Sequence, residues 1–245
     1  MPETGRSQTA RSLRRMAAFV VRVWLPDRPG ALGQVASRIG SVRGDIIGVD
    51  VLECDGGVAI DDFAVNLADP ELVPMLVRVI EEVDGASVEE VRVVNHFPDP
   101  RLDALESATR LCQVGSVKEL HEALVEQVRQ EFLAEWSALI VGVGPAEEHV
   151  PGNGADAREA RVVATSGEAA PAADHIEALA LGVAASPLVA SGAAGPEDLA
   201  AAPLSHHRSV LLASRSGYAL RERERGQLIA LARIADRLWD LLVGT

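Results

Sequence analysis

Apolar residues along the first hundred positions follow two spacings, one typical of strands and one typical of helices. They alternate with other residues over four stretches, which predicts strands at 19–25, 46–53, 58–67 and 88–94. Before the second and the fourth of these strands, apolar residues recur every three or four positions, as on the buried face of an amphipathic helix. The predicted order is β-α-β-β-α-β, which places both helices on one face of a four-stranded antiparallel sheet.

The pattern changes after 96–100, where two prolines in three residues interrupt any regular element. We therefore predict a flexible leader at 1–17, a first domain at 18–97 and a second domain at 101–245. In the second domain, residues 145–156 are predicted to be a loop, and 191–203, rich in Ala, Gly and Pro, has no defined element. Its apolar spacing predicts helices at 102–114, 117–132, 172–188 and 221–243, and strands at 137–143, 161–165 and 209–214.

Composition and charge narrow the environment and the partners. The chain has 245 residues, of which 36 are acidic and 23 basic, for a net charge of −13. This charge repels phosphate backbones and anionic membrane surfaces, so we expect no nucleic-acid and no membrane partner. No apolar run reaches the length of a membrane span. Cys54 and Cys112 have no disulfide or metal spacing, which fits a cytoplasmic protein.

The turn between the first strand and the first helix is the best candidate for a binding site. A helix N-terminus exposes amide N–H groups and the positive end of the helix dipole, and both suit a carboxylate. Gly30 would let a ligand approach the main chain, and Asp27 beside it would suit an ammonium group. A small zwitterion would satisfy both ends of the turn. In a purely structural interpretation, Asp27 caps the helix and Pro29 starts it.

The element order, the Asp-Arg-Pro-Gly-Ala-Leu turn and the Gly-Asp-Ile-Ile start of the second strand resemble an ACT domain over about 19–94. The resemblance implies a ferredoxin-like βαββαβ fold that binds an amino acid at a homodimer interface. There, the first turn of one subunit faces the second strand of its neighbour. Serine-binding members have Asn where this chain has Asp27 and Asp45, so the resemblance does not name the effector. The residues that it implies for ligand binding are Asp27, Arg28, Pro29, Gly30, Ala31 and Leu32 in the turn, and Asp45, Ile46 and Ile47 in the facing segment.

The second domain resembles a GAF domain over about 102–242, above all in the strand at 210–214, the segment 218–224 and the helix that follows. The resemblance implies an α/β/α domain with an antiparallel sheet, so the whole chain is predicted to be of the α+β class. The cyclic-nucleotide residues of GAF domains are not found, and we expect no cofactor. The mixed charges of 221–224 predict a solvated helix start.

Catalytic patterns are sparse. The histidines show no HExxH-like spacing, the Gly-rich segments lack the marks of dinucleotide or phosphate loops, and neither cysteine has an obvious His partner. We therefore expect no catalytic residues and no metal site. The segment Ser205–His207 is predicted to line or cap the last strand.

These observations predict a non-catalytic regulatory homodimer that senses an amino acid in its ACT-like domain. The GAF-like domain would relay the signal to an unidentified protein partner. Two alternatives stay open. One is a dimerisation scaffold without a ligand, which Trp24 filling the space beside Gly30 would favour. The other is an allosteric enzyme with its site in 149–207, which a cleft formed by His149, His175, Glu177 and His206 would favour.

Overall fold

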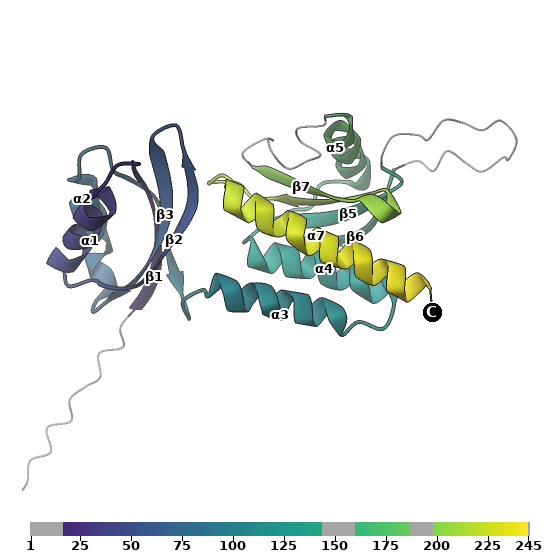
Figure 1. The fold of residues 1–245 in the computed structure, drawn as a ribbon, viewed down its shortest axis with the longest axis horizontal. Coiled ribbons are helices and arrows are strands. Elements are labelled where there is room, and N and C mark those ends of the chain that lie inside the picture. Colours follow the sequence, from purple (N-terminus) through teal and green to yellow (C-terminus); the bar gives the residue numbers. More distant parts are fainter. Residues whose placement is uncertain (1–16, 144–159, 187–197, 245) are drawn as a thin grey trace, which may run out of the picture. The chain divides into compact units, whose positions relative to one another are not determined.

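A computed structural model describes residues 17–143, 160–186 and 198–244 (Figure 1). The contacts divide the chain into a first unit, 1–97, and a second unit, 98–245, and the division lies within the predicted 96–100 segment. The first strand begins at Ala17, so residues 1–16 of the predicted leader lie outside the described residues. The predicted loop at 145–156 lies outside them as well.

The described part of the first unit has the predicted β-α-β-β-α-β order, and Figure 1 shows both helices on one face of the sheet. The four strands pair antiparallel in the order β2-β3-β1-β4, which leaves β2 and β4 at the edges. The predicted four-stranded antiparallel sheet is confirmed. The elements are β1 (Ala17–Pro26), α1 (Ala31–Ser41), β2 (Asp45–Asp55), β3 (Val58–Leu67), the 3-10 turn η1 (Pro70–Leu72), α2 (Val73–Glu81) and β4 (Ser87–Val94).

The core of the first unit lies between the sheet and its two helices. Successive side chains of a strand point to opposite faces, so alternate residues of β1 and β3 contact the helices. The helices contribute residues three to four positions apart, which fall on one side of each helix. The fully or nearly buried members are Phe19, Val21, Val23 and Leu25 from β1, Ala59, Phe63, Val65 and Leu67 from β3, Ala31, Val35 and Ile39 from α1, and Leu76 and Ile80 from α2.

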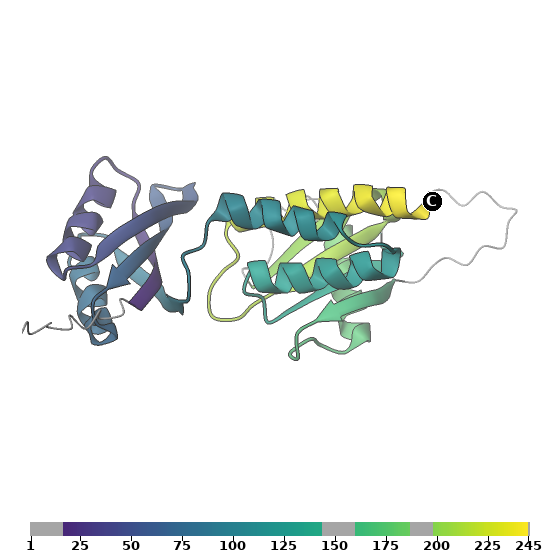
Figure 2. The same ribbon diagram turned by 90° about the horizontal axis from the view of Figure 1, so that it is seen from below.

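The second unit has a second antiparallel sheet, in the order β6-β5-β8-β7. One apolar core joins this sheet to α4 and α7, with α3 packed on both helices, and another joins it to α5 on the opposite face. Figures 1 and 2 show these layers. The α+β class is therefore confirmed for the chain. The described elements are α3 (Pro100–Cys112), α4 (Val117–Glu131), β5 (Trp136–Val141), β6 (Arg161–Ser166), α5 (Ala173–Ala185), β7 (Leu199–Leu204), the 3-10 turn η2 (Ser205–His207), β8 (Ser209–Ser214) and α7 (Glu222–Val243).

Strand β7 lies in a segment for which the sequence predicted no defined element. Its residues Ala200, Ala201 and Ala202 have low strand propensity. The sequence pattern therefore did not predict this strand. All three are buried, because β7 has α7 on one face and the second core on the other. Pro203 is tolerated because β7 is an edge strand.

The predicted solvated start of α7 is wrong for Arg221, which is buried, and for Glu224, whereas Glu222 is exposed. Arg215 is 2% exposed, and its guanidinium meets both carboxylate oxygens of Glu224 at 2.9 and 2.7 Å. The same guanidinium donates to the carbonyls of Phe132, Tyr218 and Ala219. Glu224 therefore faces the interior as the partner of a buried arginine. No helix among the described residues is both long and apolar enough to cross a bilayer.

Candidate functional site

The turn between β1 and α1 is held by main-chain hydrogen bonds. The amide of Asp27 donates to the carbonyl of Gly57 at 2.9 Å, which ties the turn to the β2–β3 hairpin. Gly30 is the N-cap residue of α1, at a φ of 89°, and no described side chain caps this helix. The structural interpretation of the turn is therefore wrong, because Asp27 does not cap α1 and Pro29 does not begin it. The N-terminus of α1 keeps its positive end available to an anion.

The space beside Gly30 is open. Apart from Gly30 and its two chain neighbours, no atom of the described residues lies within 4 Å of the position that a Cβ atom at Gly30 would take. Trp24 therefore does not fill this space. A filled space would have favoured the scaffold alternative. The left-handed backbone at Gly30 also favours glycine over any residue with a side chain.

The two segments that the ACT resemblance implies lie at opposite ends of the sheet within one chain. Pro26, next to the turn, pairs with Val58 of β3, whereas Asp45, at the start of β2, pairs with Asn66. Eight residues of an extended strand span about 27 Å. One copy of the chain therefore does not bring Arg28, Ala31 and Leu32 of the turn to Asp45, Ile46 and Ile47 of the facing segment.

A buried carboxylate that sequence analysis missed lies near the turn. On β3, Asp61 occupies the same face as Ala59 and Phe63, which pack against the helices, and it is 3% exposed. Its Oδ1 has no hydrogen-bond partner among the described residues. Burial, followed by the charges of Asp62 and Asp27, raises the pKa of Asp61 to about 6. The signal was present in the sequence, because Asp61 interrupts an apolar alternation.

Cys54 of β2 completes this group of residues. It pairs with Ala59 of β3, and its thiol shares a hydrogen bond with the carboxylate of Asp27. Desolvation, followed by that hydrogen bond and by the charges of Asp27 and Asp61, raises the pKa of Cys54. We call Asp27, Gly30, Cys54 and Asp61 the turn site. Among the described residues, no group of three or more His, Cys, Asp and Glu side chains is arranged to hold a metal ion.

The neighbouring Asp62 points to the opposite face of the sheet and has charged partners there. The guanidinium of Arg22 donates to its two carboxylate oxygens at 2.8 and 3.0 Å, and that of Arg92 lies 3.2 Å away. The two adjacent aspartates therefore differ in environment. Asp62 lies in an arginine network, whereas the charged residues that act on the pKa of Asp61 are both acidic.

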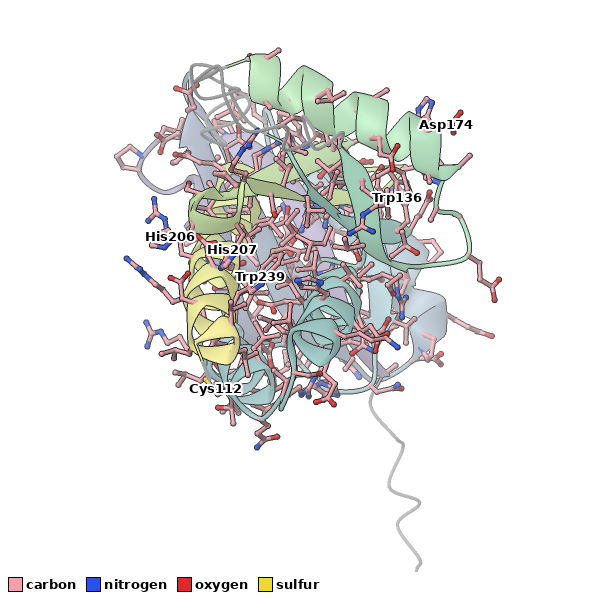
Figure 3. All side chains as sticks on the ribbon, turned by 90° about the vertical axis from the view of Figure 1, so that its right-hand side faces the viewer. Cys112, Trp136, Asp174, His206, His207 and Trp239 are labelled. Atoms are coloured by element: carbon pink, nitrogen blue, oxygen red, sulfur yellow. The ribbon has the colours of Figure 1, made fainter. Side chains whose placement is uncertain are left out.

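The residues of the enzyme alternative do not form one cleft within the described part of the chain. His149 lies outside it. Glu177 accepts a hydrogen bond from the amide of Val162 at 3.0 Å, which links α5 to β6. Figure 3 places Asp174, the residue before His175, far across the second unit from His206.

A histidine group that sequence analysis missed surrounds Trp239 of α7. The ring of His207 stacks on Trp239 with centroids 4.1 Å apart, and His121 of α4 meets the same ring edge-on at 4.1 Å. Figure 3 shows His207 beside Trp239. His206 lies 2.9 Å and His207 3.1 Å from the carboxylate of Asp240. Burial, followed by the charge of His207, lowers the pKa of His121 to about 4. These contacts fasten η2 to α4 and α7.

Comparison with known proteins gives fold likenesses only. No protein-family model and no curated protein matches the sequence. Among solved structures, the GAF domain from Acinetobacter phosphoenolpyruvate-protein phosphotransferase is 13% identical, with a TM-score of 0.41, and the match covers 61% of this chain and 98% of that one. The ACT domain from GTP pyrophosphokinase of Chlorobium tepidum is 15% identical, with a TM-score of 0.27, over 32% of this chain and 99% of that one.

A third match is the phytochrome photosensory core module of Stigmatella aurantiaca, which is 14% identical with a TM-score of 0.38. This match covers 80% of this chain and 42% of that one. The neighbours thus include ACT and GAF domains. All three TM-scores lie below 0.5, so these likenesses assign no ligand and no partner to this chain.

Proposed function

We propose that this chain is a non-catalytic regulatory protein whose first unit binds an amino acid at the β1–α1 turn. The observation that carries the proposal is the N-terminus of α1, which has no side-chain cap and opens beside Gly30 onto unfilled space. The amide groups there suit the carboxylate of an amino acid. Asp27, at the other end of the same turn, suits its ammonium group.

The edge strand β2 supports a homodimer. Ile47, Val49 and Val51 of this strand are exposed, at 51%, 39% and 49%, although they are apolar. Antiparallel pairing of β2 with β2 of a second copy would cover the strand edge. It would also bring the Asp45 end of one β2 to the Cys54 end of the other, which adjoins the turn. The amino acid would then contact both subunits and favour the dimer.

The second unit would receive the signal and pass it to a protein partner. Binding in the first unit can change the conformational equilibrium of the second unit only if the amino acid binds two conformations of the protein with different affinities. The change in that equilibrium cannot exceed the difference in binding free energy. No step in this scheme requires catalysis, a metal or a cofactor. Binding of an amino acid at the turn therefore decides whether the proposed function is correct.

A thermal-shift screen against the twenty amino acids tests it. A compound present at a hundred times its dissociation constant adds about 2.7 kcal/mol to the free energy of unfolding, which is a readily measured shift. We expect one or a few amino acids to shift the midpoint. The Gly30→Val variant should lose that shift, because a side chain would enter the open space, whereas Gly33→Ala, in the body of α1 with open space around it, should keep it. The absence of any shift would favour the scaffold.

A further inference from the structure

Asp61 lies where the fold calls for an apolar side chain. The residues of β3 that share its face and pack against the helices are Ala59, Phe63, Val65 and Leu67. An ionised carboxylate removed from water costs several kcal/mol unless a cation or hydrogen-bond donors compensate it. Such a residue in a core stripe therefore needs a compensating partner or a function.

The described residues provide no such partner. Oδ1 of Asp61 is buried and receives no hydrogen bond from them. The arginines closest along the strands, Arg22 and Arg92, engage Asp62 on the opposite face of the sheet. Asp27 and Cys54 approach from the turn and from β2, and neither brings a positive charge. Within the described part of the chain, no cation balances the charge of Asp61.

We infer that Asp61 is a ligand-binding residue whose carboxylate receives, together with Asp27, the ammonium group of the bound molecule. This inference rests on the proposed function and deepens it, since it assigns the ligand class as a primary amine that also carries a carboxylate. Two carboxylates beside one small cation offer several oxygen acceptors to the three N–H donors of an ammonium group. A metal ion is the other candidate cation, but the described residues do not form a metal-binding group.

This arrangement couples binding to protonation. The titratable groups that interact with Asp61 are its neighbour Asp62 on the opposite face of the sheet, Asp27 from the turn and Cys54 from β2. The pKa of Asp61 is about 6, so at pH 6 about half of the molecules carry a proton on this carboxyl group. Pairing with an ammonium group requires the ionised form, so binding releases that proton to the buffer. Affinity should fall about tenfold between pH 7 and pH 5, because the ionised fraction falls about tenfold.

Isothermal titration calorimetry on the full-length chain tests the inference. The probes are the amino acids that shift the melting temperature of the wild type, together with their N-acetyl derivatives, which lack the ammonium group. Titrations at pH 6 in two buffers with different ionisation enthalpies count the protons released. The variant is Asp61→Asn, which keeps the shape and removes the charge, and the matched control is Asp55→Asn, an exposed acid at the end of β2.

We expect Asp61→Asn to bind the amino acid at least tenfold more weakly at pH 7, without proton release, while Asp55→Asn behaves like the wild type. The N-acetyl derivative should bind the wild type at least tenfold more weakly than the free amino acid. Asp61→Asn should stay folded, with a melting temperature at or above that of the wild type, since it removes a buried charge.

Two other outcomes would overturn the inference and are distinguishable. If an amino acid binds Asp61→Asn with wild-type affinity and without a change in proton release, the role of Asp61 is refuted and the proposed function stands. If no amino acid binds the wild-type chain, the role of Asp61 and the proposed function are both refuted.

Discussion

Buried ionisable side chains in this protein differ in what surrounds them. Arg215 is compensated by Glu224 and by main-chain carbonyls. His121 is kept neutral by burial next to His207 and packs on the edge of Trp239. Asp61 has no compensating group for its Oδ1 among the described residues. Compensation stabilises the fold, whereas an uncompensated charge lowers stability and marks a candidate binding residue.

Removing the charge of Asp61 should stabilise the protein at neutral pH. Its folded-state pKa, about 6, is raised from an ordinary 3.8, so the folded state holds the proton more tightly than the unfolded state does. The resulting stability is present below pH 3.8 and is lost as the pH rises through 6. Asp61→Asn should therefore raise the free energy of unfolding by about 2–3 kcal/mol at pH 7. Urea unfolding at pH 4 and pH 7 checks this, and a variant less stable than the wild type at pH 7 would contradict it.

His121 should change the pH dependence of the free energy of unfolding in the opposite direction to Asp61. Its folded-state pKa, about 4, is lowered from an ordinary 6.5, so the stability it gives is present above pH 6.5 and is lost as the pH falls towards 4. The loss amounts to about 3 kcal/mol when complete. His121→Gln should lose less stability than the wild type between pH 7 and pH 4.5 in urea unfolding followed by tryptophan fluorescence. Parallel losses in both proteins would refute the assignment.

At the scale of elements, the sequence is most informative where spacing and turn residues agree. The strand predicted at 58–67 has those bounds, and the helices at 102–114 and 117–132 begin and end within two residues of the prediction. Strand β7 was missed because three consecutive alanines carry no alternation, and only its burial between α7 and the second core explains it.

The turn site was predictable only in part. Asp27 and Gly30 follow from local chemistry at a strand-to-helix turn. Cys54 joins them through the register of β2 on β3, which includes two bulges that no spacing rule reveals. The Trp239 group is likewise invisible in sequence, because its rings come from α4, η2 and α7.

The buried ion pair between Arg215 and Glu224 at the start of α7 can be tested by mutation. Glu224→Ala should destabilise the protein by about 3–5 kcal/mol, because it leaves the buried Arg215 guanidinium without its carboxylate. Glu222→Ala, two residues earlier and exposed, should change the free energy of unfolding by less than about 1 kcal/mol. Equal effects of the two substitutions in urea unfolding would show that the Arg215–Glu224 pair does not anchor the helix.

At the scale of the whole molecule, an amino-acid site shared by two subunits requires a dimer built on β2. Val49→Lys places a charge on the exposed apolar edge strand and should yield a monomer that binds amino acids weakly. The control is Val93→Lys on β4, the other edge strand, where the side chain is 73% exposed. Sedimentation velocity distinguishes them, and a Val49→Lys variant that remains dimeric would exclude β2 as the interface.

Hydrogen–deuterium exchange of the full-length chain reports directly on binding of an amino acid at the β1–α1 turn. Exchange should be compared with and without the amino acid that gives the largest thermal shift. We expect slower exchange at 27–33, where the amides of the α1 N-terminus would meet the carboxylate, and at 54–61, next to Cys54 and Asp61. Unchanged exchange in both segments, or protection confined to the second unit, would show that the amino acid does not bind at this turn.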